Sequence, residues 1–157
     1  MRRAILGAFG VAAISLACED VLVPRPVGDL HNAPASVAID GQELMLTAFL
    51  WRDFMPSSPP DRKPLVAIFR PVAAGDGTVP TSVRIDTAWV VLGNDVWTVP
   101  ITEERLPSAQ QAYYEAVARN GPKWGPGVTV DVIVRIRAAG GTGQLLRAPN
   151  QPIHRTD

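Results

Sequence analysis

Apolar and polar residues alternate along most of the chain after residue 35, a period that is typical of β-strands with one buried face. The clearest case is Val128–Arg137, in which Val130, Val132 and Val134 share one face and Asp131 and Arg135 lie on the other. The same reasoning predicts strands over residues 36–39, 44–51, 65–69, 82–92, 96–101 and 144–146, with a short one at Ile153.

Turn residues separate these strands. Asp40–Gly41 and Gly93–Asn94–Asp95 are typical of tight hairpins, because glycine and asparagine tolerate a positive φ. Residues 44–51 are apolar at nearly every position, which predicts a strand covered on both faces. Residues 82–92 place Val83, Ile85, Trp89 and Val91 on one face, which we expect to lie in the core.

One segment has helical spacing instead. Ser108 is a suitable helix cap, Ala112, Tyr113 and Ala116 recur at intervals of a helical turn, and Asn120–Gly121–Pro122 is a stop signal. We therefore predict a short helix over about residues 108–120, between late strands.

About seven short strands with regular turns predict an all-β domain over residues 35–157, arranged as an antiparallel two-layer sandwich. With its crossing helix, this body resembles immunoglobulin-like domains. The resemblance is architectural, since the chain has a single cysteine and no inter-sheet cysteine pair. A small β-barrel is the alternative topology.

The N-terminus has the pattern of an export signal. Arg2 and Arg3 precede an uncharged apolar run of fourteen residues, 4–17, and Cys18–Glu19–Asp20 then turns acidic. A basic start, an apolar stretch of this length and small residues at its end are typical of a secretory signal peptide, here residues 1–17. The run is shorter than the roughly 20 residues of a membrane-spanning helix.

Ser15–Leu16–Ala17–Cys18 resembles the lipobox of bacterial lipoproteins, in which cleavage before the cysteine precedes its lipidation. The resemblance covers residues 1–18 and implies fatty-acyl chains, palmitate among them, on Cys18. It further implies attachment to a bacterial membrane, at the periplasmic or the cell-surface side. The same residues also fit ordinary secretion, which would release a soluble protein.

The segment that follows, residues 18–34, contains Pro24, Pro26 and Pro34 and has no sustained periodicity, which predicts an extended tether. The whole chain has fifteen basic and fifteen acidic residues, and the loss of Arg2 and Arg3 leaves a formal charge of −2. Nucleic acid is not an expected partner, because its binding usually requires clustered positive charge.

Candidate chemistry is sparse. The glycine runs lack a following Lys–Ser/Thr, no nucleophile elbow is present, and Glu103–Glu104 are neighbours that point to opposite faces of an extended chain. His31 and His154 lie in terminal segments, where exposed polar residues are common, so we predict no metal site and no cofactor. Arg84, Arg135 and Arg137 lie on outward strand faces and are expected to pair with Asp86 or Asp131.

Four residues are the candidates for ligand binding. Trp124 lies in a glycine- and proline-rich loop, where it either folds over the end of the domain or meets a partner, and Trp97 is undecided between these roles. Arg52 and Asp53, at the end of a strand, would recognise a ligand or form a salt bridge. The sequence thus predicts a non-enzymatic exported lipoprotein of the cell envelope, a binding or structural module whose partner is a protein or a sheet edge. Carbohydrate binding through Trp124 and Trp97 is the alternative, and an enzyme is the least favoured one.

Overall fold

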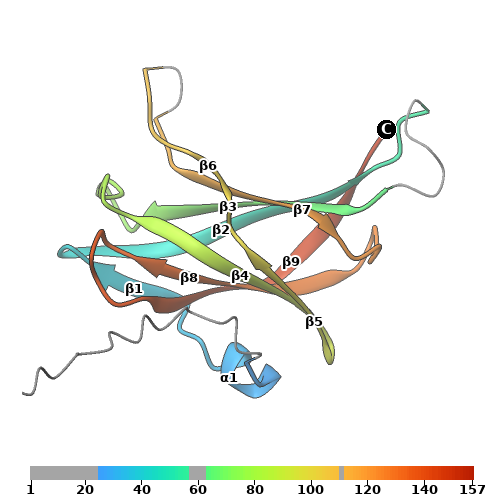
Figure 1. Ribbon diagram of the computed structural model, residues 1–157, viewed down its shortest axis with the longest axis horizontal. Coiled ribbons are helices and arrows are strands. Elements are labelled where there is room, and N and C mark those ends of the chain that lie inside the picture. The colour runs from blue at the N-terminus through green and yellow to red at the C-terminus, as the bar shows by residue number, and fades with distance from the viewer. Residues whose placement is uncertain (1–24, 57–62, 110–111) are drawn as a thin grey trace, which may run out of the picture.

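The computed structural model describes residues 25–56, 63–109 and 112–157, which form one short helix and nine strands (Figure 1). The predicted signal peptide and Cys18 lie outside the described residues. The elements in chain order are α1 (Val27–His31), β1 (Ser36–Ile39), β2 (Gln42–Asp53), β3 (Leu65–Ala73), β4 (Arg84–Leu92), β5 (Asp95–Pro100), β6 (Glu103–Arg105), β7 (Glu115–Gly121), β8 (Thr129–Arg137) and β9 (Gln144–Thr156). No helix in these ranges has the length and apolar character of a membrane span.

The strands form one continuous sheet in the order β5-β4-β8-β9-β2-β3-β7-β6, and β1 pairs with β2 beside this path. The sheet curls into a half-barrel, so the β5-β4-β8 half faces the β2-β3-β7-β6 half (Figure 1). Strand β9 joins the halves, since it pairs antiparallel with β8 and, from Ile153 onward, parallel with β2. The predicted all-β class is confirmed, and the architecture combines the two facing layers of a sandwich with the continuous curl of a barrel.

The main core lies between the two halves of the sheet. Phe69 and Leu50 from one half meet the inward valines of β8 from the other, and all of these side chains are buried. The alternation predicted for residues 128–137 is confirmed, because Val130, Val132 and Val134 belong to this core. Burying such side chains contributes roughly 25 cal/mol per Å² of apolar surface, which makes this layer the main source of stability.

Both predicted hairpin turns are confirmed. Ile39 pairs with Gln42 across a two-residue turn in which Asp40 and Gly41 have φ of 50° and 76°. Positive φ at both central residues gives the turn the twist that matches the flanking strands, and glycine adopts it without steric cost. The second two-residue turn, Gly93–Asn94, connects β4 to β5, and of its two residues only Gly93 has a positive φ, of 60°.

A register shift in β4 changes one expectation. Between Ile85 and Thr87 the pairing with β8 shifts, so the residues on either side of Asp86 do not keep a common face. Val83 and Ile85 point into the main core, as expected, whereas Trp89 and Val91 are buried on the opposite side of the sheet. The predicted single face of residues 82–92 was therefore wrong, although all four residues are buried.

The prediction of a helix over residues 108–120 was also wrong. Residues 115–121 form β7, which pairs with β3 on one side and with β6 on the other. Tyr114, Ala116 and Ala118 point into the core, while Glu115 and Arg119 point outward. A segment with both helical and alternating spacing takes the conformation that its sheet partners stabilise.

The one helix of the described residues, α1, lies instead at Val27–His31, where the sequence predicted an extended tether. Leu30 is fully buried and packs with Ala33 on Trp89 and Ile133. The helix therefore lies on the outer side of the β4–β8 half, and Figure 1 shows it outside the sheet. Arg147 donates to the carbonyl of His31, and the Arg147 N–H donates to the carbonyl of Pro34. Residues 27–34 are thus part of the folded domain.

Candidate functional site

The large exposed apolar side chains come from strands of the β2-β3-β7-β6 half of the sheet or from the segments next to them. Among the described residues these are Met45, Phe49, Met55, Leu106 and Tyr113, and each is between 43 and 49% exposed. All five belong to β2 or lie next to the ends of β2, β6 or β7. The outer side of the β4–β8 half differs, because α1 covers its apolar residues there. The asymmetry singles out the outer side of the β2-β3-β7-β6 half as a candidate site.

We call the apolar part of this surface the aromatic face, formed by Met45, Phe49, Trp51, Ile68 and His154. Phe49 lies opposite Ile68 on β3, and Trp51 lies opposite His154 on β9. The Phe49 ring centroid is 4.9 Å from that of His154, with the rings stacked, and 5.4 Å from that of Trp51. Phe49 therefore packs against both neighbouring rings, an arrangement that is favourable for aromatic side chains.

The outward residues of β2 correct a sequence expectation. Residues 44–51, with Trp51 at their end, were predicted to form a strand that is covered on both faces. Leu44, Leu46 and Leu50 do point into the core, but Met45 and Phe49 alternate with them and are exposed. An apolar residue at an outward strand position indicates burial only if a second layer exists, and here none of the described elements covers it.

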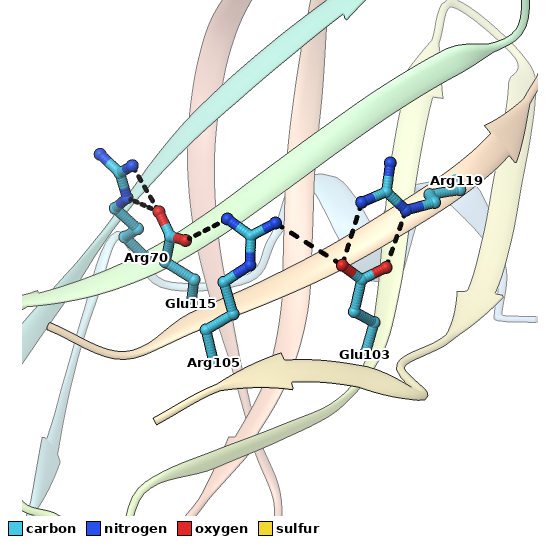
Figure 2. A network of polar contacts seen from close by, with 5 residues as sticks. All are labelled: Arg70, Glu103, Arg105, Glu115 and Arg119. Carbon is cyan, nitrogen blue, oxygen red and sulfur yellow. Dashed lines mark hydrogen bonds and ion pairs between the residues drawn. The ribbon is translucent and has the colours of Figure 1, made fainter. Parts of the chain in front are cut away.

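Beside the aromatic face lies a row of alternating charges that crosses β3, β7 and β6 (Figure 2). We call it the ion-pair row, and it consists of Arg70, Glu115, Arg105, Glu103 and Arg119. Its central residue is Glu115, whose side chain is only 2% exposed. Glu115 forms ion pairs with Arg70 on one side and with Arg105 on the other. The Arg70 Nε donates to Glu115 at 2.5 Å, and the Arg105 guanidinium lies 3.3 Å from it. A carboxylate this buried requires such partners, because an unpaired buried charge is costly.

Glu103 continues the row. It lies 3.7 Å from Arg105 and accepts two hydrogen bonds from Arg119, at 2.7 and 3.0 Å (Figure 2). These hydrogen bonds hold the pKa of Glu103 below its usual value and raise that of Arg119. Three arginines against two glutamates leave the row one positive charge in excess.

Arg70 connects the two parts of the surface. Its guanidinium carbon lies 4.5 Å from the Tyr113 ring centroid, and Arg70, together with Phe49, Ile68 and Thr47, lines a shallow pocket of about 140 Å³. The site therefore combines exposed aromatic rings, an arginine that is held in place and a small depression. These groups are enriched where proteins bind one another.

Two of the sequence-predicted site residues hold the chain itself. Arg52 donates from Nε to the carbonyl of Lys63 at 2.7 Å, and from one terminal nitrogen to the carbonyls of Lys123 and Gly125 at 3.0 and 2.5 Å. Asp53 accepts a hydrogen bond from the Met55 N–H at 2.9 Å. Arg52 thus ties the end of β2 to the 123–125 loop, and Asp53 stabilises the turn that follows.

The two candidate tryptophans pack on the main core. Trp97 is partly buried and lies so close to Gly121 that a Cβ there would be 2.7 Å from its ring. Trp124 is also partly buried against the core, next to the Gly125–Pro126 cis peptide bond. Both rings are therefore partly covered by the domain itself.

The histidines lie in different surroundings. His31 is 2.9 Å from Asp131, whereas His154 stacks on Phe49. Within the described ranges no group of three or more His, Cys, Asp or Glu side chains is placed to hold a metal ion.

Sequence reasoning missed the ion-pair row because Arg70 is 45 positions from Glu115 along the chain, and because residues 115–119 were predicted to be helical. The outward positions of β2 carried a usable signal, since Met45, Phe49 and Trp51 recur with a period of two. The pairing of Arg135 and Arg137 with Asp86 was predicted and is confirmed, with Nε–oxygen distances of 2.5 and 3.2 Å. No family model, curated protein or solved structure matches the chain.

Proposed function

We propose that this protein is an exported lipoprotein, anchored through Cys18, that binds a protein partner of the cell envelope through the aromatic face and the adjoining ion-pair row. The observation that carries the proposal is the unequal covering of the two outer sides of the sheet. One side is closed by α1, whereas the other exposes Met45, Phe49 and Tyr113. Contiguous exposed apolar side chains rimmed by charges are typical of protein-binding surfaces.

The chemistry of the surface describes the partner. A segment that covers Phe49 and Ile68 must be apolar, because desolvating these two side chains is favourable only against other apolar groups. The same segment meets a row with an excess positive charge at its rim, where Arg119 is 50% exposed. We therefore expect a partner that presents apolar side chains flanked by carboxylates, since complementary charge sets orientation and speeds association.

The position of the anchor is consistent with this orientation. The chain enters the domain through α1, on the outer side of the β4–β8 half, and the aromatic face lies on the opposite side of the core. Cys18 is seven positions before Arg25, and seven extended residues reach at most about 25 Å. A membrane held by Cys18 would be near α1 and would leave the aromatic face open to the envelope.

Site-specific cross-linking tests the binding surface. A photoreactive phenylalanine derivative replaces Phe49 in the native host, and a matched variant carries it at Thr98, an exposed position on β5. We expect one partner protein cross-linked from position 49 and not from position 98. In addition, Arg119→Glu should lower the yield from position 49 by roughly tenfold, the equivalent of about 1.4 kcal/mol, because it repels a carboxylate-bearing partner.

Three results would contradict the proposal. A product with the mass of two copies of this chain would show self-association, equal yields from positions 49 and 98 would show chance contact, and no product would show an unoccupied face. The anchor is tested separately. Cys18→Ser should abolish the incorporation of radioactive fatty acid, and unchanged labelling would exclude lipidation at this residue.

A further inference from the structure

A second surface, on the side of the anchor, concentrates positive charge. A pocket of about 420 Å³ lies between the outward side of β4 and β8, the approach to α1 and the β8–β9 turn. Its charged lining residues are Arg25, Arg135, Arg137 and Asp86. Three guanidinium groups against one carboxylate leave a formal charge of +2, in a protein with no net charge overall.

Asp86 organises this pocket. It lies at the register shift of β4, and each of its carboxylate oxygens accepts a hydrogen bond from the Nε of one arginine, Arg135 at 2.5 Å and Arg137 at 3.2 Å. The carboxylate thereby fixes two guanidinium planes side by side, although like charges on one strand would otherwise repel. Arg84, directly opposite Arg137 in the sheet, bonds instead to the carbonyls of Thr81 and Val83.

The glycine-rich turn closes the pocket on another side. Gly141, Thr142 and Gly143 line it, and a Cβ on Gly143 would lie 2.7 Å from the Arg135 side chain. Glycine is required for this close approach of the turn backbone to the aliphatic part of the Arg135 side chain. Arg25 completes the lining from the N-terminal side, where its guanidinium carbon lies 5.7 Å from the Trp89 ring centroid.

The geometry points to a phosphate-binding site formed by Arg25, Arg135 and Arg137. Guanidinium groups match the oxygens of a phosphate ester, and a net charge of +2 offsets a mono- or dianion. Because Arg25 is only seven positions from Cys18, this inference rests on the proposed anchor for its ligand: the headgroup phosphate of an anionic lipid in the same membrane. A soluble phosphate ester has the same chemistry, and the test separates the two sources.

The test uses the full chain in nanodiscs of phosphatidylcholine alone or mixed with phosphatidylglycerol, and in detergent with added glycerol phosphate. NMR follows the side-chain resonance of Arg137 and the amides of residues 140–143. We expect saturable shifts with glycerol phosphate, and the same shifts in discs only when phosphatidylglycerol is present. The double variant Arg25→Gln/Arg137→Gln should weaken glycerol phosphate binding roughly tenfold. Arg155→Gln, at an exposed arginine outside the pocket, should leave it unchanged.

Each other outcome overturns a stated part of the inference. Shifts with glycerol phosphate but not in phosphatidylglycerol discs would overturn the lipid source, and no saturable shift in either medium would overturn the site. Equal weakening by Arg155→Gln would show a general charge effect. Thermal melts of the variants check the fold. Fatty-acid labelling of Cys18 is measured independently, so loss of the anchor and loss of the phosphate site give different results.

Discussion

The Tyr114 hydroxyl, next to β7, accepts a hydrogen bond of 2.9 Å from the backbone N–H of Ile85 in β4 and so joins the two facing halves of the sheet. The same hydroxyl donates to Glu104. Tyr114 is 2% exposed, and its burial, followed by the contact with Glu104, raises the pKa of its hydroxyl far above the usual value. The hydroxyl therefore stays protonated and keeps its donor role at neutral pH and well above it.

Tyr114→Phe removes this link and leaves the Ile85 N–H without its partner inside the core. We expect a loss of about 1–3 kcal/mol in the free energy of unfolding, measured by urea denaturation. Glu104→Gln keeps an acceptor in place and should cost less than Tyr114→Phe. Equal stability of Tyr114→Phe and the parent protein would mean that the hydrogen bond between the halves contributes nothing.

Substitutions at Glu115 and Glu103 should destabilise the protein to different extents, although both residues belong to one ion-pair row. Glu115 is almost fully buried between Arg70 and Arg105, whereas Glu103 is 39% exposed. Glu115→Gln brings amide hydrogens against the arginine donors in a buried place, and we expect it to cost about 1–3 kcal/mol. Glu103→Gln, in the same row, should cost less than about 1 kcal/mol, because exposed pairs contribute little. Chemical denaturation of the two variants provides the comparison, and a larger loss for Glu103→Gln would contradict it.

The all-β class and most strands could be predicted because alternation and turn chemistry are local. Val130, Val132 and Val134 point inward as their spacing requires, and Asp40–Gly41 forms its turn from its own conformational preferences. What local pattern cannot determine is the pairing partner. Residues 112–117 fit a helical spacing equally well, and only the presence of β3 and β6 on either side makes β7 a strand.

The candidate sites illustrate the same limit. Arginine is a residue type that is common in ligand-binding sites, but the partners of Arg52 are the backbone carbonyls of residues 63, 123 and 125, which the sequence does not place near it. The single-residue shift at Asp86 moves Trp89 to the other side of the sheet, where α1 covers it. A bulge of this kind leaves no clear signal in the sequence, and it changes which apolar residues are inside.

The ion pairs and hydrogen bonds of Asp131 lead us to expect that the folded protein loses stability in acid. Burial alone would raise its pKa, but hydrogen bonds from the Asn150 N–H, Arg147 and His31 outweigh this effect and lower it. Because the pKa in the folded protein lies below the ordinary 3.8, the contribution to stability is present above that pH and is lost as the pH falls below it. These contacts fasten α1 and its following segment to β8 and β9, so we expect Trp89 to become exposed during the same transition.

Tryptophan fluorescence during an acid titration measures the exposure of Trp89 and the loss of stability, with Asp131→Asn as the comparison. The variant should be less stable near neutral pH and should lose less stability on acidification than the parent protein, since it has no charge at this position to lose. The exposed carboxylates are common to both proteins and cancel in the difference. Identical titration curves for the two proteins would exclude Asp131 as the cause.

Alanine substitutions at Gly121 and, as a control, at Gly28 test how closely Trp97 packs against the chain. A Cβ at Gly121 would lie 2.7 Å from the Trp97 ring, whereas a Cβ at Gly28 would meet nothing within 4 Å. Gly121→Ala therefore has to displace a rigid indole from the edge of the core, and we expect a loss of about 1–3 kcal/mol. Gly28→Ala, inside α1, should be neutral or stabilise by up to about 1 kcal/mol, because alanine loses less backbone entropy in a helix. Thermal unfolding of both variants gives the comparison. If Gly121→Ala were as stable as Gly28→Ala, Trp97 would have room to move, and its ring would be available to a ligand after all.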